Sequence, residues 1–196
     1  MRAIGIYGAS GHGKVVADIA KLCDYQKIIF IDDAKEGLPT LEEFQKRYNY
    51  PIAWGIGDNE TRRQKAPLIE HFATLIHPNA VVAESARIGE GSVVMAGAVI
   101  NPDATVGAHT IINTGAVVEH DCLIGDFVHI APNCALAGGV QVGDATFIGI
   151  GSNVIQNVHI GSEVLVGAGS VVLEDIDNGL IAYGVPAKVR GKRTLR

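Results

Sequence analysis

Residues 100–129 read INPDAT VGAHTI INTGAV VEHDCL IGDFVH, and this rhythm of six decides the fold. The first position of every hexad is aliphatic and the fifth carries a small or short side chain. The same rule holds without an insertion from residue 76 to residue 171, through sixteen hexads. A fixed short period of this kind predicts a β-helix, in which each hexad forms one side of a coil and stacked coils bury a continuous core.

Glycine recurs once in every three hexads. Five glycines occupy the second position of a hexad at intervals of eighteen residues: Gly89, Gly107, Gly125, Gly143 and Gly161. Because glycine suits tight turns and positive φ, this column predicts one corner that is repeated once per coil. Three hexads per coil give a triangular prism, with neighbouring coils about 4.8 Å apart.

The sixth position of each hexad lies between two inward positions and should face outward, since side chains alternate along a strand. Many of these outward residues are apolar: Val93, Val99, Ile111, Val117, Leu123, Phe147 and Leu165. A lone prism would leave much of this apolar surface exposed to water, which is unusual for a soluble protein. We therefore expect a homo-oligomer in which prisms pack side against side.

The composition indicates a turn-rich globular protein. The 196 residues are 47% hydrophobic, include 24 glycines and carry a net charge of −5, which argues against nucleic acid as the main partner. No apolar run approaches the ~20 residues of a membrane span, and the N-terminus lacks a signal-peptide pattern. Cys122 and Cys134 take the small interior position of the repeat, so we expect buried, reduced thiols and a cytoplasmic protein.

Residues 1–75 follow a different pattern, in which apolar strands alternate with helices. Strands are expected at 3–7, 27–31 and 52–56, with an amphipathic helix over 15–22 and Asn59 as the N-cap of a later helix. This alternation predicts a small parallel sheet.

The predicted fold class is an α/β domain with a small Rossmann-like parallel sheet, followed by a parallel β-helix. We expect the α/β domain over residues 1–75 and the β-helix over 76–175. A C-terminal strand or loop with a basic tail should occupy 176–196.

Polar or glycine residues follow each predicted strand of the N-terminal domain. They are Gly8, Ser10, Gly11, His12 and Gly13 after the first strand, Asp32 and Asp33 after the second, and Gly57 and Asp58 after the third. Ligands bind at the carboxyl ends of such strands. A glycine loop before a helix can bind phosphate, and an acidic residue about twenty positions later can accept hydrogen bonds from a ribose or a base edge. The spacing Gly-x-x-Gly-x-Gly is not the dinucleotide fingerprint, and a tight strand-to-helix turn alone would also explain the glycines.

Several segments together resemble one family. They are Tyr-Gly-Ala-Ser-Gly-His-Gly at 7–13, Ile-Asp-Asp at 31–33, Gly-Ile-Gly-Asp-Asn-Glu at 55–60, the hexapeptide run, and Gly-Val-Pro-Ala-Lys at 184–188. The family is that of the bacterial nucleotide-sugar N-acetyltransferases of the PglD type, which acetylate a UDP-4-amino-sugar with acetyl-CoA on the way to bacillosamine-like glycans. The resemblance covers almost the whole chain. It implies a left-handed β-helix, a homotrimer, acetyl-CoA and a UDP-amino-sugar as substrates, and no metal.

His120 is the candidate general base, because imidazole titrates near neutrality and this residue lies at an outward corner between Glu119 and Asp121. Val-Glu-His-Asp-Cys at 118–122 matches the family's catalytic segment, which places Asp121 at the orienting carboxylate. The family usually has glutamate there, so the shorter Asp121 could reach His120 less closely or through water.

The resemblance implies roles for other residues as well. Asn113 and His129 match positions that face the acetyl group and the sugar, and His129 is expected to help polarise the thioester carbonyl. Gly138 matches a residue whose backbone N–H contacts acetyl-CoA. The matches to the cofactor groove are Ile150, Gly167 and Ala168.

Other charged residues have weaker assignments. His77, His109 and His159 match nothing catalytic and are expected at the surface or at an interface. The basic residues of the tail would attract the CoA phosphates or would only be solvated: Lys188, Arg190, Lys192, Arg193 and Arg196.

The expected reaction is direct attack of a sugar amine on the thioester, without an acyl-enzyme, because the cysteines near His120 lie at interior positions. An O-acetyltransferase acting on a sugar hydroxyl or sialic acid remains an alternative on the same residues. A third hypothesis is a zinc hydratase like the γ-carbonic anhydrases, although the spacing of nine residues between His120 and His129 fits it poorly. The fourth hypothesis is a non-catalytic scaffold that binds a nucleotide sugar.

Overall fold

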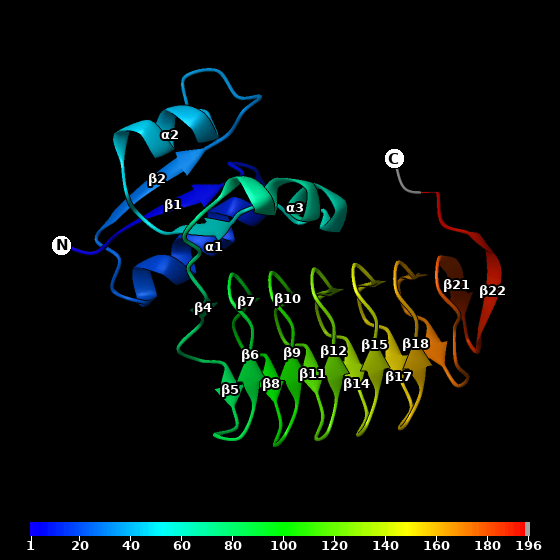
Figure 1. Cartoon of the computed structure of the whole chain (residues 1–196). Coiled ribbons are helices and arrows are strands. Elements are labelled where there is room, and N and C mark those ends of the chain that lie inside the picture. Colours follow the sequence, from blue (N-terminus) through cyan, green and yellow to red (C-terminus); the bar gives the residue numbers. More distant parts are fainter. Residues whose placement is uncertain (195–196) are drawn as a thin grey trace.

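The computed structural model describes residues 1–194 and places a small α/β domain over the first coils of a long β-helix (Figure 1). The elements of the α/β domain are β1 (Ala3–Tyr7), α1 (Gly11–Leu22), β2 (Lys27–Ile31), α2 (Leu41–Arg47), β3 (Ile52–Trp54), α3 (Asn59–Lys65) and the 3-10 helix η1 (Ala66–Leu68). Its three strands are parallel in the order β2-β1-β3. The predicted small parallel sheet is confirmed, whereas α2 was not predicted.

The start of α3 differs from the prediction. Asp58, not Asn59, is the N-cap, and its carboxylate accepts a hydrogen bond from the backbone N–H of Thr61 at 2.8 Å. Asn59 is the first helical residue and is buried against the β-helix, where its Nδ2 donates to the carbonyls of Ala145 and Thr146. The side chain expected to begin the helix therefore connects the two parts of the chain.

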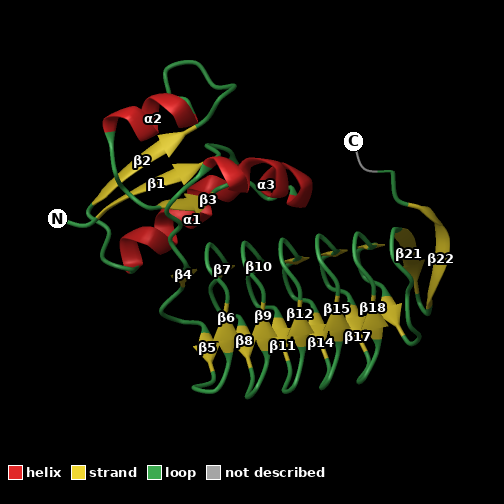
Figure 2. Ribbon diagram, in the orientation of Figure 1, coloured by secondary structure: helices red, strands yellow, loops and turns green. Residues whose placement is uncertain are grey.

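Two-residue strands repeat every six residues through the β-helix (Figure 2). They are β4 (Leu75–Ile76), β5 (Val81–Val82), β6 (Arg87–Ile88), β7 (Val93–Val94), β8 (Val99–Ile100), β9 (Thr105–Val106), β10 (Ile111–Ile112), β11 (Val117–Val118), β12 (Leu123–Ile124), β13 (His129–Ile130), β14 (Ala135–Leu136), β15 (Gln141–Val142), β16 (Phe147–Ile148), β17 (Asn153–Val154), β18 (His159–Ile160), β19 (Leu165–Val166) and β20 (Val171–Val172). Each strand pairs in parallel with strands eighteen residues away, as Ile111 does with Val93 and His129. The predicted three-hexad coil is confirmed.

The pairing produces three faces, which we name by their surroundings. The docked face, in the order β19-β16-β13-β10-β7-β4, lies under the α/β domain. The apolar face has the order β20-β17-β14-β11-β8-β5, and the first, outward residues of its strands are Val81, Val99, Val117, Ala135, Asn153 and Val171. The polar face has the order β18-β15-β12-β9-β6, with the outward residues Arg87, Thr105, Leu123, Gln141 and His159.

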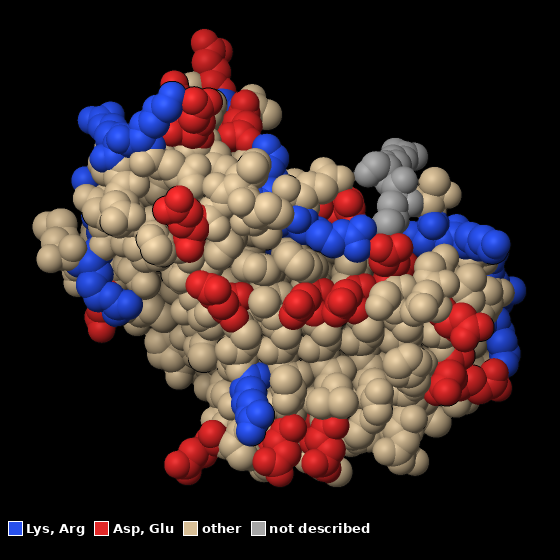
Figure 3. All heavy atoms as spheres, viewed as in Figure 1, with Lys and Arg blue, Asp and Glu red and all other residues tan. Residues whose placement is uncertain are grey.

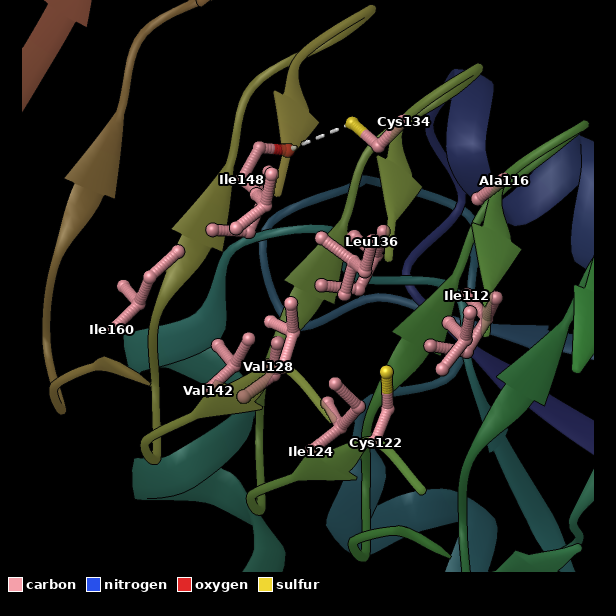
Figure 4. Packing of buried hydrophobic residues seen from close by; sticks show 14 of the residues in the cluster. Ile112, Ala116, Cys122, Ile124, Val128, Cys134, Leu136, Val142, Ile148 and Ile160 are labelled. Carbon is pink, nitrogen blue, oxygen red and sulfur yellow. Dashed lines mark hydrogen bonds between the residues drawn. The ribbon is translucent and has the colours of Figure 1, made fainter. Parts of the chain in front are cut away.

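The interior of the prism is filled by the first and fifth residues of the hexads (Figure 4). Ile112, Ile130 and Ile148 stack on one side of this core and are fully buried. Cys122 and Cys134 are buried, as predicted, and neither forms a disulfide within residues 1–194. Burial raises the pKa of both thiols above their ordinary value.

The glycine column has a different cause from the expected one. These glycines do not have positive φ, and a Cβ on Gly125 would lie 2.3 Å from Oδ1 of Asp144 in the next coil. Positive φ occurs instead at the fourth position of several hexads, for example at His109 (55°) and Asp121 (60°). Close approach of stacked coils is therefore what requires glycine at the second position.

Some of the outward apolar residues are covered by the α/β domain of the same chain rather than left for a second copy. Val93 and Ile111 on the docked face are fully buried, because Val16 and Ala17 of α1 pack in the same cluster. Leu123 on the polar face is 49% exposed. On the first coils of the docked face, the α/β domain of the same chain therefore covers part of the apolar surface that was expected to need a second copy.

The C-terminal segment forms a hairpin in which β21 (Leu180–Gly184) pairs antiparallel with β22 (Ala187–Lys192) and extends the docked face. Basic side chains gather at this end of the molecule (Figure 3), and Lys188, Arg190 and Lys192 are exposed. Arg193, by contrast, is held against the β-helix, because it donates hydrogen bonds to the carbonyls of Ala145 and Val164. Arg196 lies outside the described residues. Within residues 1–194, no helix has the length and apolar character to cross a membrane.

Candidate active site

His120 lies in the loop that joins β11 to β12, at the corner between the apolar and polar faces. Its Nδ1 is 2.7 Å from Oδ2 of Asp121, so the shorter carboxylate reaches the ring directly rather than through water. This contact assigns the ring proton to Nδ1 and leaves the lone pair of Nε2 free. The hydrogen bond to Asp121 raises the pKa of His120 above 6.5, and the side chain is 62% exposed. The arrangement suits a general base that faces solvent or a partner.

Gly138 lies one coil further along the same corner, directly against the imidazole. A Cβ at this position would lie 2.6 Å from both Cε1 and Nε2 of His120. No acceptor for the backbone N–H of Gly138 is found among residues 1–194. The absence of a side chain thus admits the ring, and a backbone donor is left beside it.

The remaining β-helix candidates lie at another corner. Asn113, Ile150, Gly167 and Ala168 are in loops that join the docked face to the apolar face. Ile150 and Ala168 are exposed. The whole width of the apolar face therefore separates them from His120, and one chain does not bring the two groups together.

His129 takes the outward position that the repeat predicts, but the α/β domain covers it. It is buried on the docked face, its Nδ1 is 3.1 Å from the carbonyl oxygen of Gly57, and its Nε2 is 3.0 Å from Nδ2 of Asn113. Oδ1 of Asn113 accepts from the backbone N–H of Thr114 at 2.8 Å, so its NH₂ group must donate to His129 and Nδ1–H of His129 must donate to Gly57. Both ring nitrogens are therefore occupied by contacts within the chain, which leaves neither of them free for the predicted contact with the thioester carbonyl.

The glycine loop after β1 combines a tight turn with an open helix end. A Cβ on Gly13 or Gly55 would lie 1.9 Å or 2.3 Å from the carbonyl oxygen of Gly8, whose φ is 109°. Gly11, by contrast, has open space around it, and the side chain of Ser10 does not cap the helix. Gly8 and Gly13 therefore serve the turn, whereas the free N–H groups at the start of α1 remain available to an anion.

The acidic candidates of the α/β domain already have internal partners. Asp32 accepts from the backbone N–H groups of Ala9 and Ala34 at 3.0 Å and 3.1 Å. Asp33 accepts from Leu41 N at 2.9 Å, from Lys65 Nζ at 2.8 Å and from the Tyr7 hydroxyl. Burial and the Asp33 carboxylate raise the pKa of Tyr7 to about 12.

His12 is the candidate with an unsatisfied group. Its Nε2 is buried without a hydrogen-bond partner among residues 1–194, and its ring lies 6.1 Å from that of His129. Burial and the nearby Arg62 cation lower the pKa of His12 to about 4. The ring is neutral at pH 7, and it lies where the α/β domain meets the docked face.

Three residues that hold the two parts of the chain together were not identified from the sequence as site residues. Arg62 is fully buried between them, Trp54 Nε1 donates to Nδ1 of His109 at 3.1 Å, and Asn59 reaches the β-helix as described. His109 is thus at an interface, as expected. The helix α3 also contains Arg63 and Lys65, so nothing in the sequence distinguishes Arg62 from these partly exposed basic neighbours.

Among residues 1–194, no group of three or more histidine, cysteine, aspartate or glutamate side chains is arranged to hold a metal ion.

Family models match both parts of the chain. The PglD N-terminal domain matches residues 3–67, and the bacterial transferase hexapeptide model, described as six repeats, matches residues 139–174. A curated protein of Bacillus subtilis (strain 168), named UDP-N-acetylbacillosamine N-acetyltransferase, is 38% identical over 115 residues. That match covers 49% of this chain and 52% of the relative, so it spans about half the length of the curated protein.

Solved structures match over nearly the full length. The acetyltransferase domain of PglB from Neisseria gonorrhoeae FA1090 is 38% identical with a TM-score of 0.91, and the match covers 97% of this chain and 100% of that one. PerB from Caulobacter crescentus, solved in complex with CoA and GDP-perosamine, is 40% identical with a TM-score of 0.90, with 97% and 98% of the two chains covered. The α/β domain, the β-helix and the order of the two are shared throughout these matches. The chain belongs to the PglD-type family of nucleotide-sugar N-acetyltransferases.

Proposed function

We propose that this protein transfers the acetyl group of acetyl-CoA to the amine of a nucleotide-linked amino sugar, with a UDP-4-amino-4,6-dideoxy-N-acetylhexosamine as the expected substrate for bacterial glycan synthesis. The observation that carries this proposal is the corner formed by His120, Asp121 and Gly138, where a base, its orienting carboxylate and a free backbone donor meet. The names of the relatives agree with it: one is a UDP-sugar acetyltransferase and another was solved with CoA and a GDP-sugar.

The proposed reaction follows from the free Nε2 of His120. This nitrogen accepts a proton from the sugar amine while the amine nitrogen bonds to the thioester carbon. The developing oxyanion accepts a hydrogen bond from a backbone donor such as Gly138 N–H. The C–S bond then breaks, and the imidazolium, stabilised by Asp121, returns the proton to the CoA thiolate. Cys122 and Cys134 offer no competing nucleophile, because both thiols are buried.

We infer that the complete site lies between copies of the chain. The two groups of candidates flank the apolar face, with His120 at one edge and Ala168 at the other. In a closed ring with apolar faces toward the axis, one edge of each prism meets the opposite edge of the next. Three copies arranged in this way would bury valines such as Val99 and Val117 and would join the two halves of the site.

The nucleotide is assigned to the α/β domain. Its diphosphate would bind the free N–H groups at the start of α1, beside Ser10 and Gly11. Asp32 and Asp33 hold the surrounding loops and each retain lone pairs for a base or ribose. We place the enzyme in the cytoplasm, where acetyl-CoA and nucleotide sugars are made.

A free-thiol release assay with a panel of nucleotide sugars tests the proposal. Among UDP-, GDP- and dTDP-linked amino sugars, the UDP-linked sugar should give CoA release, whereas the matching hydroxy sugars and sialic acid should not. His120→Ala should lower kcat by about 10²–10⁴-fold. Turnover with sialic acid alone would instead establish O-acetylation, and a wild-type rate in His120→Ala would remove the base assignment.

A further inference from the structure

Arg62 is buried between the α/β domain and the β-helix, and among residues 1–194 no carboxylate is in direct contact with it. Its relative exposure is 0%, and within the same residues its guanidinium donates to oxygens of carbonyl type. These are the backbone carbonyls of Ile56, Gly57, His109, Phe127 and Val128 and the side-chain oxygen of Asn59. Burial lowers the pKa of Arg62 to about 9, so the guanidinium is charged at neutral pH.

These contacts come from both parts of the chain. Ile56 and Gly57 belong to the loop after β3, at the carboxyl end of the sheet where the nucleotide is assigned. His109, Phe127 and Val128 belong to two successive coils of the β-helix. One planar side chain therefore fixes the distance and angle between the nucleotide loop and the prism.

The carbonyl of Gly57 continues the connection toward the acetyl-transfer residues. It accepts from Nη1 of Arg62 at 2.9 Å and from Nδ1 of His129 at 3.1 Å. Nε2 of His129 then accepts from Nδ2 of Asn113, which keeps a second N–H free. The contact of Thr114 N–H with Oδ1 and the chain Arg62–Gly57–His129–Asn113 together leave Asn113 with a free N–H donor.

The charge of Arg62 also disfavours protonation of His129 and so favours the neutral Nδ1–H tautomer. Burial, followed by the Arg62 cation, lowers the pKa of His129 to about 3. The other polar groups around His129 are neutral: the His12 ring of α1 and the Asn113 amide. A proton on Nε2 would confront Asn113 Nδ2 with a second donor and would force the amide to turn.

We propose that Arg62 is a positioning residue for acetyl transfer, which acts through Gly57 and His129 to hold the nucleotide loop on the β-helix and to keep the Asn113 amide presented as a donor. This inference rests on the proposed function, because Asn113 is a site residue only there. Arg62 itself is fully buried, so we assign it no contact with either substrate.

The test compares Arg62→Met and Arg62→Lys with a matched control, Arg63→Met. Arg63 follows in the same helix and also reaches the β-helix, through Glu163 at 2.7 Å, but it has no link to Gly57 or His129. Histidine ¹⁵N spectra of the full-length protein report the tautomer of His129. Steady-state kinetics on folded protein then separate kcat from the KM of each substrate.

In the wild type, the His129 spectrum should show Nδ1–H with an unprotonated Nε2. Arg62→Met should give mixed or exchanging His129 signals and a kcat about 10²-fold lower, with the KM for acetyl-CoA unchanged. Arg62→Lys retains the charge but not the planar fork, so it should lose about tenfold in kcat. Arg63→Met should retain the wild-type spectrum and kcat.

Arg62→Met protein that is folded, keeps Nδ1–H on His129 and turns over within about threefold of the wild type would overturn the proposal. If Arg62→Met does not fold, Arg62→Lys decides in the same way, since wild-type spectra and kcat in that variant would also overturn it. Failure of the proposed function looks different: the wild type would not release CoA with any amino sugar, while the His129 spectra would still respond to Arg62.

Discussion

Replacing Gly138 by alanine tests the geometry of the base without removing any catalytic group. The new Cβ would lie 2.6 Å from Cε1 and Nε2 of His120 and 3.2 Å from Nδ1. Ordinary carbon contacts lie at about 3.5–4.0 Å, so the imidazole must move by roughly 1 Å. A displacement of this size costs about 10²-fold in rate, or about 3 kcal/mol of transition-state stabilisation.

The same substitution should leave the fold intact. Gly138 is not among the residues with positive φ, so alanine fits its backbone conformation. The His120 side chain is largely exposed and can turn into solvent without disturbing the core. Because alanine restricts the unfolded chain, the free energy of unfolding should stay level or rise by about 0.4–1 kcal/mol.

The assay is CoA release at saturating substrates, together with the pH profile of kcat/KM. Gly138→Ala should lower kcat about 10²-fold, and the acid limb should move to lower pH, because a displaced ring loses the Asp121 contact that raises its pKa. Gly191→Ala is the control, since a Cβ there meets nothing within 4 Å. A folded Gly138→Ala variant with kcat within about threefold of the wild type would refute the reasoning.

Three further perturbations have expected outcomes. Asp121→Asn should lower the pKa of His120 toward its ordinary value, so the acid limb of kcat/KM moves to lower pH while kcat falls about 10–100-fold; an unshifted limb would contradict the pairing. The pKa values of His12 and His129 are lowered to about 4 and about 3 in the folded chain. As the pH falls below 6.5, both rings therefore become protonated in the unfolded chain but stay neutral in the folded chain. Urea unfolding should therefore show a loss of about 4 kcal/mol between pH 7.5 and pH 5, roughly halved in His12→Gln, and a flat profile would count against both buried rings. Gly125→Ala forces a Cβ to 2.3 Å from the next coil and should cost about 1–3 kcal/mol in thermal unfolding, whereas an unchanged Tm would contradict the stacking explanation.

The β-helix could be predicted because every coil repeats the same constraint. An aliphatic first residue and a short fifth residue are required wherever the chain lines the interior, so the period survives in the sequence. The burial of Cys122 and Cys134 follows from that period, whereas coil size and register follow from the glycines that recur every eighteen residues. The His120–Asp121 pair could be located for a similar reason, since two adjacent residues at one corner remain neighbours in any such coil.

Contacts between the two parts of the chain could not be predicted in this way. His129 takes an outward position of the repeat, and only the docking of the α/β domain turns that position into a buried one. Arg62 and Arg63 are adjacent in one polar helix, yet one is fully buried and the other pairs with Glu163 near the surface. No local pattern separates them, because the difference arises from long-range packing.

Co-assembly of two inactive variants tests most directly whether the site is shared between copies. His120→Ala removes the base at one edge of the apolar face, and Ala168→Trp blocks the groove at the other edge. If each site takes one edge from each of two neighbours, mixing the unfolded chains in equal amounts and refolding them should restore about one quarter of wild-type activity, because each edge is intact in half of the chains. Activity no higher than that of the separate variants, in mixed oligomers of confirmed composition, would show that a single chain carries the whole site.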